Sequence, residues 1–175
     1  MKPLVMIALL ITCQGLAGCE RFREPEIFLI PENYRSEVYI IYDQPCSAAV
    51  EYEGNRRVYR IPENGILLTE FKYDRGTMNQ QYFLVDSTGK RKKLFVLRHD
   101  DNPRLTKNPR QPMPDEVVIG NGGSGGRMEK DILFQKFRVI HYDRDNDTKA
   151  EFRKEWARDS TMKVLLENCR KSQEH

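Results

Sequence analysis

Short apolar runs alternate with polar and turn-forming residues along most of this chain. Runs of about four to eight β-branched and aromatic residues, bounded by Pro, Gly, Asn or Asp, are typical of β-strands. The strands predicted in this way span residues 27–30, 37–42, 57–61, 66–71, 81–85, 93–97, 117–119 and 133–140. Short strands at such regular spacing predict a mainly β fold, an Ig-like or transthyretin-like antiparallel β-sandwich.

The apolar pattern changes to a helical period near the C-terminus. Thr148 and Glu151 have the spacing of a capping box, in which side chains satisfy backbone N–H groups of the first turn. Phe152 and Trp156 follow four residues apart. Apolar residues then continue at helical spacing at Met162, Leu165, Leu166 and Cys169. We expect a C-terminal helix that packs this face on the sheet, divided into two short helices near residues 159–161.

Two stretches follow neither period and are expected to be surface loops. Residues 99–116 hold four prolines, and residues 120–126 are rich in glycine. Loops on a rigid scaffold often carry binding residues. The candidate partner-binding residues are Arg104, Arg110, Gly122 and Gly125.

The stretch from Gly120 to Gly125 also matches the glycine spacing of dinucleotide-binding loops. Such a site needs a helix directly after the glycines, within a βαβ unit. The pattern that follows predicts a strand instead, so we expect no dinucleotide and no other cofactor.

The N-terminus is a short apolar segment that ends at a cysteine. Lys2 precedes an apolar run over residues 4–10, and Leu-Ala-Gly at 16–18 precedes Cys19. This layout is typical of a secretory signal peptide, and it resembles the signal of bacterial lipoproteins. The resemblance implies cleavage before Cys19 and a diacylglyceryl group on its thiol. An uncleaved anchor is the alternative, but residues 3–18 are fewer than the about 20 that a spanning helix needs.

The signal sets the expected domain organisation. Residues 1–18 are the signal peptide, 19–26 a lipidated tether, 27–146 the β-sandwich, and 147–171 the C-terminal helix on the same domain. Glu20 follows the cysteine, where an Asp retains enterobacterial lipoproteins at the inner membrane. The resemblance therefore implies a lipid-anchored protein of the bacterial cell envelope, at the outer membrane in a Gram-negative host.

Charge patterning excludes one class of partner. The chain has 29 Lys and Arg against 26 Asp and Glu, a formal net charge of +3. The two signs are mixed along the sequence, without the one-sided basic footprint of a nucleic-acid-binding protein. We expect no nucleic-acid partner.

Cysteine usage points to one disulfide. Cys13 lies in the leader and Cys19 is the lipidation site, which leaves Cys46 and Cys169 in a compartment that permits disulfides. We expect these two to bond and to tie the front of the domain to its last helix. Two isolated thiols are the alternative.

Three alternating carboxylates form a candidate calcium site. Asp143, Asp145 and Asp147 have the spacing of the first ligands in a calcium-binding loop. Thr148 stands where the sharp turn of that loop needs Gly. The competing interpretation is an acidic cluster stabilised by the helix dipole.

His99 and His141 are the other candidates for chemistry. Each stands close to aspartates, so the two could bind a metal or act as bases of a secreted hydrolase. Each is also expected at a strand end, where a surface side chain is the simpler interpretation.

Two turn motifs resemble a known family. Residues 28–34 read Phe-Leu-Ile-Pro-Glu-Asn-Tyr, and residues 61–67 read Ile-Pro-Glu-Asn-Gly-Ile-Leu. They are similar to the Ile-Pro-Glu-x-Tyr and Ile-Pro-x-x-Gly-x-Leu motifs of a family of bacterial lipoproteins without an assigned activity. The resemblance therefore implies no site residues.

The sequence favours a non-enzymatic binding or assembly module of the cell envelope. Its expected partners are the membrane, through the N-terminal lipid, and an envelope protein. A hydrolase or metal-dependent enzyme using His99 and His141, and a calcium-stabilised structural domain, are the alternatives.

Overall fold

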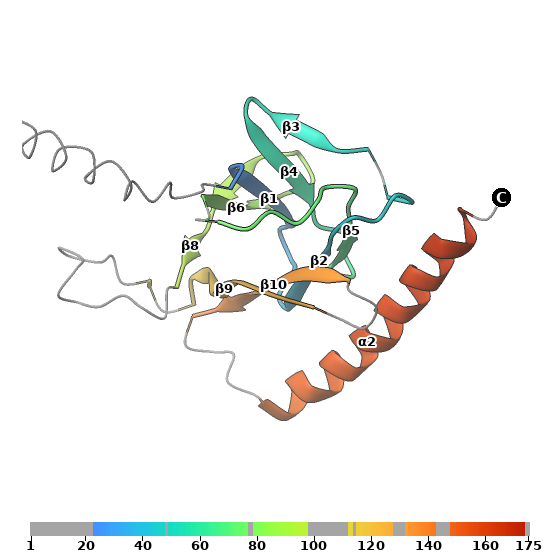
Figure 1. The fold of residues 1–175 in the computed structure, drawn as a ribbon. Helices are drawn as coiled ribbons and strands as arrows, with labels where there is room; N and C mark the ends of the chain where they lie inside the picture. Colours follow the sequence, from blue (N-terminus) through green and yellow to red (C-terminus); the bar gives the residue numbers. More distant parts are fainter. Residues whose placement is uncertain are drawn as a thin grey trace, which may run out of the picture.

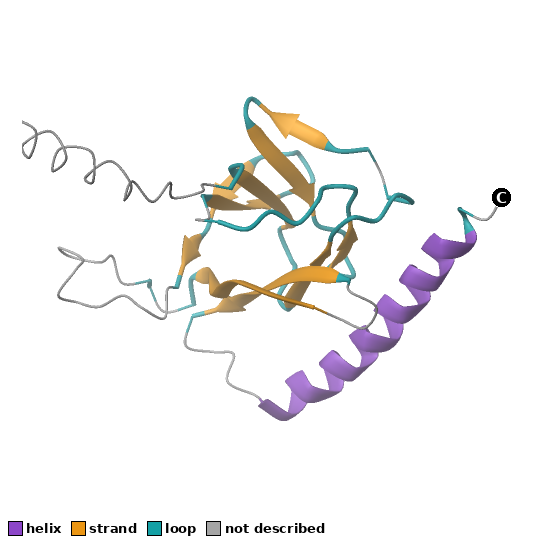
Figure 2. Ribbon diagram, in the orientation of Figure 1, coloured by secondary structure: helices purple, strands orange, loops and turns teal. Residues whose placement is uncertain are grey.

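Two five-stranded β-sheets pack face to face, and one helix lies on the outside of the second sheet (Figure 1). The computed structural model describes residues 23–47, 49–76, 79–97, 112–113, 115–127, 132–142 and 148–173. Figure 2 shows strands and connecting loops making up the sandwich, with the helix set against one side.

The first sheet is built around the first strand of the described chain. Its order is β3 (Glu51–Glu53), β4 (Arg56–Arg60), β1 (Glu26–Pro31), β6 (Gln80–Val85) and β7 (Arg91–Lys93). The central strand β1 runs parallel to both β4 and β6, and the two edge strands pair antiparallel.

The second sheet has a different arrangement of directions. Its order is β5 (Ile66–Leu68), β2 (Glu37–Ile41), β10 (Leu133–His141), β9 (Val117–Arg127) and β8 (Phe95–Val96). The long strand β10 pairs antiparallel with both neighbours, whereas the edge strands β5 and β8 pair parallel.

The mainly β sandwich with a C-terminal helix is confirmed, but purely antiparallel pairing is wrong. Both sheets are mixed, because the chain passes repeatedly from one sheet to the other. After β1 the chain enters the second sheet as β2 and returns as β3 and β4. A strand that returns after such an excursion can run in the same direction as the strand it joins, and a period-two pattern carries no information about direction.

Aromatic rings fill the centre between the sheets. The Phe28 ring stacks on Tyr59 and Tyr82, with ring centres 4.9 and 4.8 Å apart, and meets the edge of Phe137 at 5.2 Å. All four side chains are buried. Rings in stacked and edge-on contact add to the apolar area that the sandwich removes from water.

The outer face of the second sheet is covered by α2 (Thr148–Lys171). Met162 and Leu166 of the helix are buried against Tyr39 and Ile41 of β2 and Ile66 of β5. Strand β2 is therefore apolar on both faces, as predicted, because one face meets the core and the other meets the helix.

The predicted division of the helix near residues 159–161 is wrong. Asp159, Ser160 and Thr161 continue the helix and are exposed, so their polar side chains remain in water. Their lower helix propensity costs only a few tenths of a kcal/mol per residue, roughly. The side chains of Phe152 and Trp156 lie outside the described part of the helix.

The glycine-rich stretch is a strand rather than the predicted surface loop. Residues 120–126, with Gly122 and Gly125 among them, belong to β9 and lie beside β10. A Cβ atom on Gly126 would lie 2.7 Å from the Phe134 ring, and one on Gly120 would lie 3.0 Å from Ile140. Packing explains Gly120 and Gly126, since the absence of a Cβ lets Ile140 and Phe134 of β10 lie over the backbone of β9.

Two smaller differences concern strand boundaries. The predicted strand over residues 93–97 is divided between β7 in the first sheet and β8 in the second. The polar strand β3 was not predicted, because its sequence Glu-Tyr-Glu lacks an apolar face. The division at residue 94 follows from the partners of the two strands, since β7 pairs with β6 and β8 pairs with β9.

Candidate functional site

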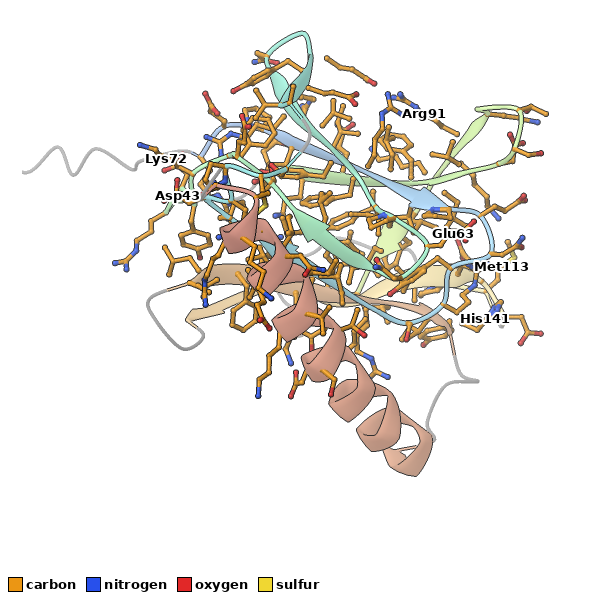
Figure 3. The ribbon with its side chains drawn as sticks, turned by 90° about the vertical axis from the view of Figure 1, so that its right-hand side faces the viewer. Asp43, Glu63, Lys72, Arg91, Met113 and His141 are labelled. Carbon is orange, nitrogen blue, oxygen red and sulfur yellow. A yellow bond between two sulfur atoms is a disulfide. The ribbon has the colours of Figure 1, made fainter. Side chains whose placement is uncertain are left out.

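The sandwich has two ends of different character. We call the end where the described chain begins, at Arg23, the N-terminal end. We call the opposite end the distal end; it holds the turns at 32–36, 61–65 and 86–90 and the last residue of β10, His141. Figure 3 shows Asp43 and Lys72 toward one end, and Glu63, Met113 and His141 toward the other.

A buried ion pair closes the N-terminal end. Arg23 donates from Nη2 to Glu26 Oε1 at 2.8 Å, and both side chains are almost fully buried. Tyr59 donates its hydroxyl to the same oxygen at 3.1 Å, and Gln80 donates its amide to Glu26 Oε2 at 2.6 Å. A buried carboxylate needs such partners, because an uncompensated charge in the interior is costly.

The ion pair is joined to the second sheet through Gln135 of β10. The Gln135 side-chain oxygen accepts from the Tyr42 hydroxyl at 3.1 Å and from Arg23 Nη1 at 3.5 Å. The Arg23 guanidinium also lies over the Tyr73 ring, 5.3 Å from its centre. Arg23 thus contacts residues of both sheets and holds the first described residues between them.

Burial raises the pKa values of three tyrosines in this region. Tyr42, Tyr59 and Tyr82 lose water around the hydroxyl, which disfavours the phenolate, and the Glu26 carboxylate raises each pKa further. Burial also opposes the charge of Arg23, yet Glu26 raises its pKa overall. The tyrosines therefore remain neutral and the arginine remains charged.

We predict a loss of stability at alkaline pH. In the unfolded chain tyrosine ionises near pH 10, roughly, whereas the three buried hydroxyls keep their protons. The unfolded state then binds fewer protons, so the unfolding free energy should fall by about 4 kcal/mol per pH unit above pH 10. Urea titrations at several pH values measure that slope.

Tyr82→Phe provides the control for this prediction, since it removes one of the three ionisable hydroxyls. The slope in that variant should decrease by about one third. An identical slope in both proteins would contradict the assignment of the pH dependence to these tyrosines.

The distal end carries two adjoining hollows. The acidic hollow has a volume of about 550 Å³ and is lined by Pro31, Glu32, Asn33, Tyr34, Arg35, Ser36, Glu63, Val85, Asp86 and Ser87. The basic cleft has a volume of about 260 Å³ and is lined by Glu32, Arg35, Leu84, Asp86, Lys90, Arg91, Lys92 and Val117. Glu32, Arg35 and Asp86 line both and separate the two.

Arg35 is held in place between the hollows by His141. Arg35 donates from Nε to His141 Nε2 at 3.2 Å and from Nη1 to the carbonyls of Glu32 and Tyr34. Because arginine can only donate, His141 Nε2 is the acceptor, so Nδ1 carries the proton and donates to the Asp115 carbonyl at 3.1 Å. His141 therefore positions Arg35, and both of its ring nitrogens are engaged.

The turns that frame the acidic hollow are fixed by their own sequences. Asp86 Oδ1 accepts from the Thr88 hydroxyl and from the backbone N–H groups of Thr88 and Lys90. These bonds, the hydroxyl bond first, lower the pKa of Asp86. In the turn at 61–65, Gly65 has a φ of 75°, and a Cβ there would collide with the Tyr34 ring. Glycine adopts this positive φ without the steric cost that a side chain would bring.

In the structure, Cys46 and Cys169 form a disulfide with their Cα atoms 5.3 Å apart. This is the pairing expected from the sequence. It joins the segment after β2 to the C-terminal end of α2, and the Cys169 sulfur also lies 3.9 Å from Gln44 Oε1.

The other predicted site residues lie outside the described residues. They are Cys19, His99, Arg104, Arg110, Asp143, Asp145 and Asp147. Within the described ranges, no group of three His, Cys, Asp or Glu side chains is placed to hold a metal ion. No helix in those ranges is long and apolar enough to cross a membrane.

The buried network was not predicted from the sequence, because Arg23 and Glu26 fall within the expected tether at residues 19–26. One residue of this network, Gln135, could have been recognised from the sequence. It shares the inward face of β10 with Phe137 and Val139, so a polar residue interrupts an apolar alternation. The distal hollows gave no such signal, because their residues come from turns far apart in the sequence.

Comparison with solved structures finds a protein of similar fold. A crystal structure of a "Putative Lipoprotein from Bacillus anthracis" matches with a TM-score of 0.51 and 17% identity. The match covers 85% of this chain and 95% of that chain, and at this identity it supports the fold alone. No curated protein matches the sequence.

A family model matches residues 23–152, which is most of the chain and includes every strand of the sandwich. The family is described as one of unknown function, and its start coincides with the buried Arg23. The chain therefore belongs to the family of unknown function DUF6843.

Proposed function

We propose that this chain is a lipid-anchored protein of the bacterial cell envelope whose sandwich is a non-enzymatic binding module. In this proposal, Cys19 carries the lipid and the distal end meets a partner. The lipoprotein-like signal and the structural similarity to a described lipoprotein support the anchor. In a Gram-negative host, the Glu20 that follows Cys19 favours the outer membrane, because it stands where an Asp would retain the protein at the inner membrane.

The observation that carries the proposal is the position of Arg23. It is buried at the N-terminal end of the sandwich and follows Cys19 by only four positions. Four residues reach at most about 14 Å. A lipid on Cys19 would therefore keep the N-terminal end close to the bilayer, and β1 would lead away from the membrane over about 20 Å.

This orientation directs the two hollows away from the membrane. Clefts with a few convergent polar groups are the usual binding sites of proteins. Met113, the exposed residue near the end of the predicted partner loop, lies at the same end. Backbone hydrogen bonds join Asp115 and Glu116 to Tyr142, so this segment lies at the distal end, beside the hollows.

The anchor is tested by metabolic labelling with a clickable palmitate analogue. The wild-type chain is expected to take up the label and to fractionate with membranes, whereas Cys19→Ala should do neither. Equal labelling of both chains would contradict lipidation at Cys19.

The binding face is tested by photo-crosslinking in the intact envelope. A crosslinking residue at Ser87, in the acidic hollow, is expected to give a discrete protein adduct. The same residue at Asn55, in the exposed turn between β3 and β4 at the N-terminal end, serves as the control. Adducts from Asn55 alone, or the same adducts from both positions, would contradict a distal binding face.

A further inference from the structure

We propose that the basic cleft binds a small amphiphilic anion, a carboxylate or phosphate group on a short apolar stem. The inference rests on the proposed function in that it names a ligand class for the distal end. It stands on three observations: an apolar floor, a cationic rim, and a wall with fewer acidic than basic residues.

The floor of the cleft is the open end of the hydrophobic core. Leu84 belongs to β6 in the first sheet, and Val117 belongs to β9 in the second. Both are largely buried, at 5% and 8% exposure, yet both line the cleft. A ligand stem that enters here contacts apolar side chains of both sheets, and a volume of about 260 Å³ suits a short stem.

The rim of the cleft is cationic. Lys90 and Lys92 are exposed, and within the described part of the chain neither forms an ion pair. Arg35 stands on the opposite wall, held by His141 and by two backbone carbonyls. Arg91 also lines the cleft, although its guanidinium is directed to Glu53.

The two acidic residues on the wall, Glu32 and Asp86, offset only part of this charge, because the basic residues of the cleft outnumber them. Asp86 Oδ1 already accepts three hydrogen bonds within the 86–90 turn. Glu32 is exposed and lines the acidic hollow as well. Ammonium and guanidinium groups that converge above an apolar floor favour a carboxylate or phosphate, through charge-assisted hydrogen bonds.

Strand β7 supplies a matched pair of variants. Lys92 lies opposite Leu84 and lines the cleft, whereas Lys93 lies opposite Phe83 and does not. Successive residues of a strand point to opposite faces. Lys92→Glu and Lys93→Glu therefore make the same change of charge on adjacent residues of one strand, and only the first faces the ligand.

The experiment measures binding of butyl phosphate to the full lipidated protein in phosphatidylcholine nanodiscs. Methyl resonances of Leu84 and Val117 report occupancy of the floor. Butyl phosphate and butyrate are expected to shift both resonances, and butanol is not. Inorganic phosphate should bind at least about tenfold more weakly than butyl phosphate, since it lacks the stem.

Lys92→Glu should weaken butyl phosphate binding by about tenfold or more, and Lys93→Glu should leave it unchanged. Equal losses in the two variants, or equal binding of butanol, would overturn the proposal, as would unshifted Leu84 and Val117 resonances. Crosslinking from Ser87 in the envelope does not depend on this result. A failure of anion binding is therefore distinguishable from a failure of the proposed binding face.

Discussion

Arg23→Ala is expected to lower the unfolding free energy by about 3–5 kcal/mol. The substitution leaves the Glu26 carboxylate almost fully buried without its cation. It also removes a donor to Gln135 and the contact with the Tyr73 ring. Urea denaturation followed by circular dichroism measures the change.

Arg60→Ala is the matched control, because Arg60 forms an ion pair with Glu51 on the exposed surface. Exposed pairs contribute at most about 1 kcal/mol. A second control, Arg23→Met with Glu26→Gln, removes both charges together, keeps an oxygen acceptor for Tyr59 and Gln80, and should recover part of the loss. Similar losses in Arg23→Ala and Arg60→Ala would show that the network is not a stabilising element.

Loss of the disulfide is expected to cost about 2–4 kcal/mol. The bond between Cys46 and Cys169 closes a loop with a sequence separation of 123, so its absence greatly increases the entropy of the unfolded chain. Thermal unfolding of the Cys46→Ser, Cys169→Ser protein, compared with oxidised wild type, measures the effect, and reduced wild type serves as the control.

The variant and the reduced wild type should unfold at similar temperatures, both below that of oxidised wild type, because both lack the covalent link. Alkylation without reductant should modify neither cysteine of the folded wild-type protein. Two alkylated thiols would show that the bond is absent, and the predicted loss of stability would then have no basis.

The sequence was most informative where one local pattern decided the structure. Alternating runs identified most strands, and the apolar spacing from Met162 to Cys169 identified the buried face of the helix. The turn at Gly65 has the proline and the glycine of positive φ that are typical of turns. In these places, the local preference and the tertiary packing agree.

Local patterns failed where a distant partner decided the outcome. The glycine-rich residues of β9 were predicted to form a loop. No local feature of the sequence indicates that Phe134 and Ile140 of β10 lie over the backbone of β9. Strand direction depends on the path of the whole chain, so the parallel pairing of β1 was not predictable. The basic cleft likewise needs Arg35, Lys92 and Val117 to meet from three separate segments.

The central position of β1 has a mechanical consequence. Tension applied through a lipid on Cys19 would act along β1, because that strand follows the anchor directly. β1 is bonded on both sides, to β4 and to β6, and its neighbours run in the same direction. Such a load shears many hydrogen bonds at once, rather than opening them one after another. The fold thus places a central strand, bonded on both sides, where a pull through a lipid on Cys19 would act.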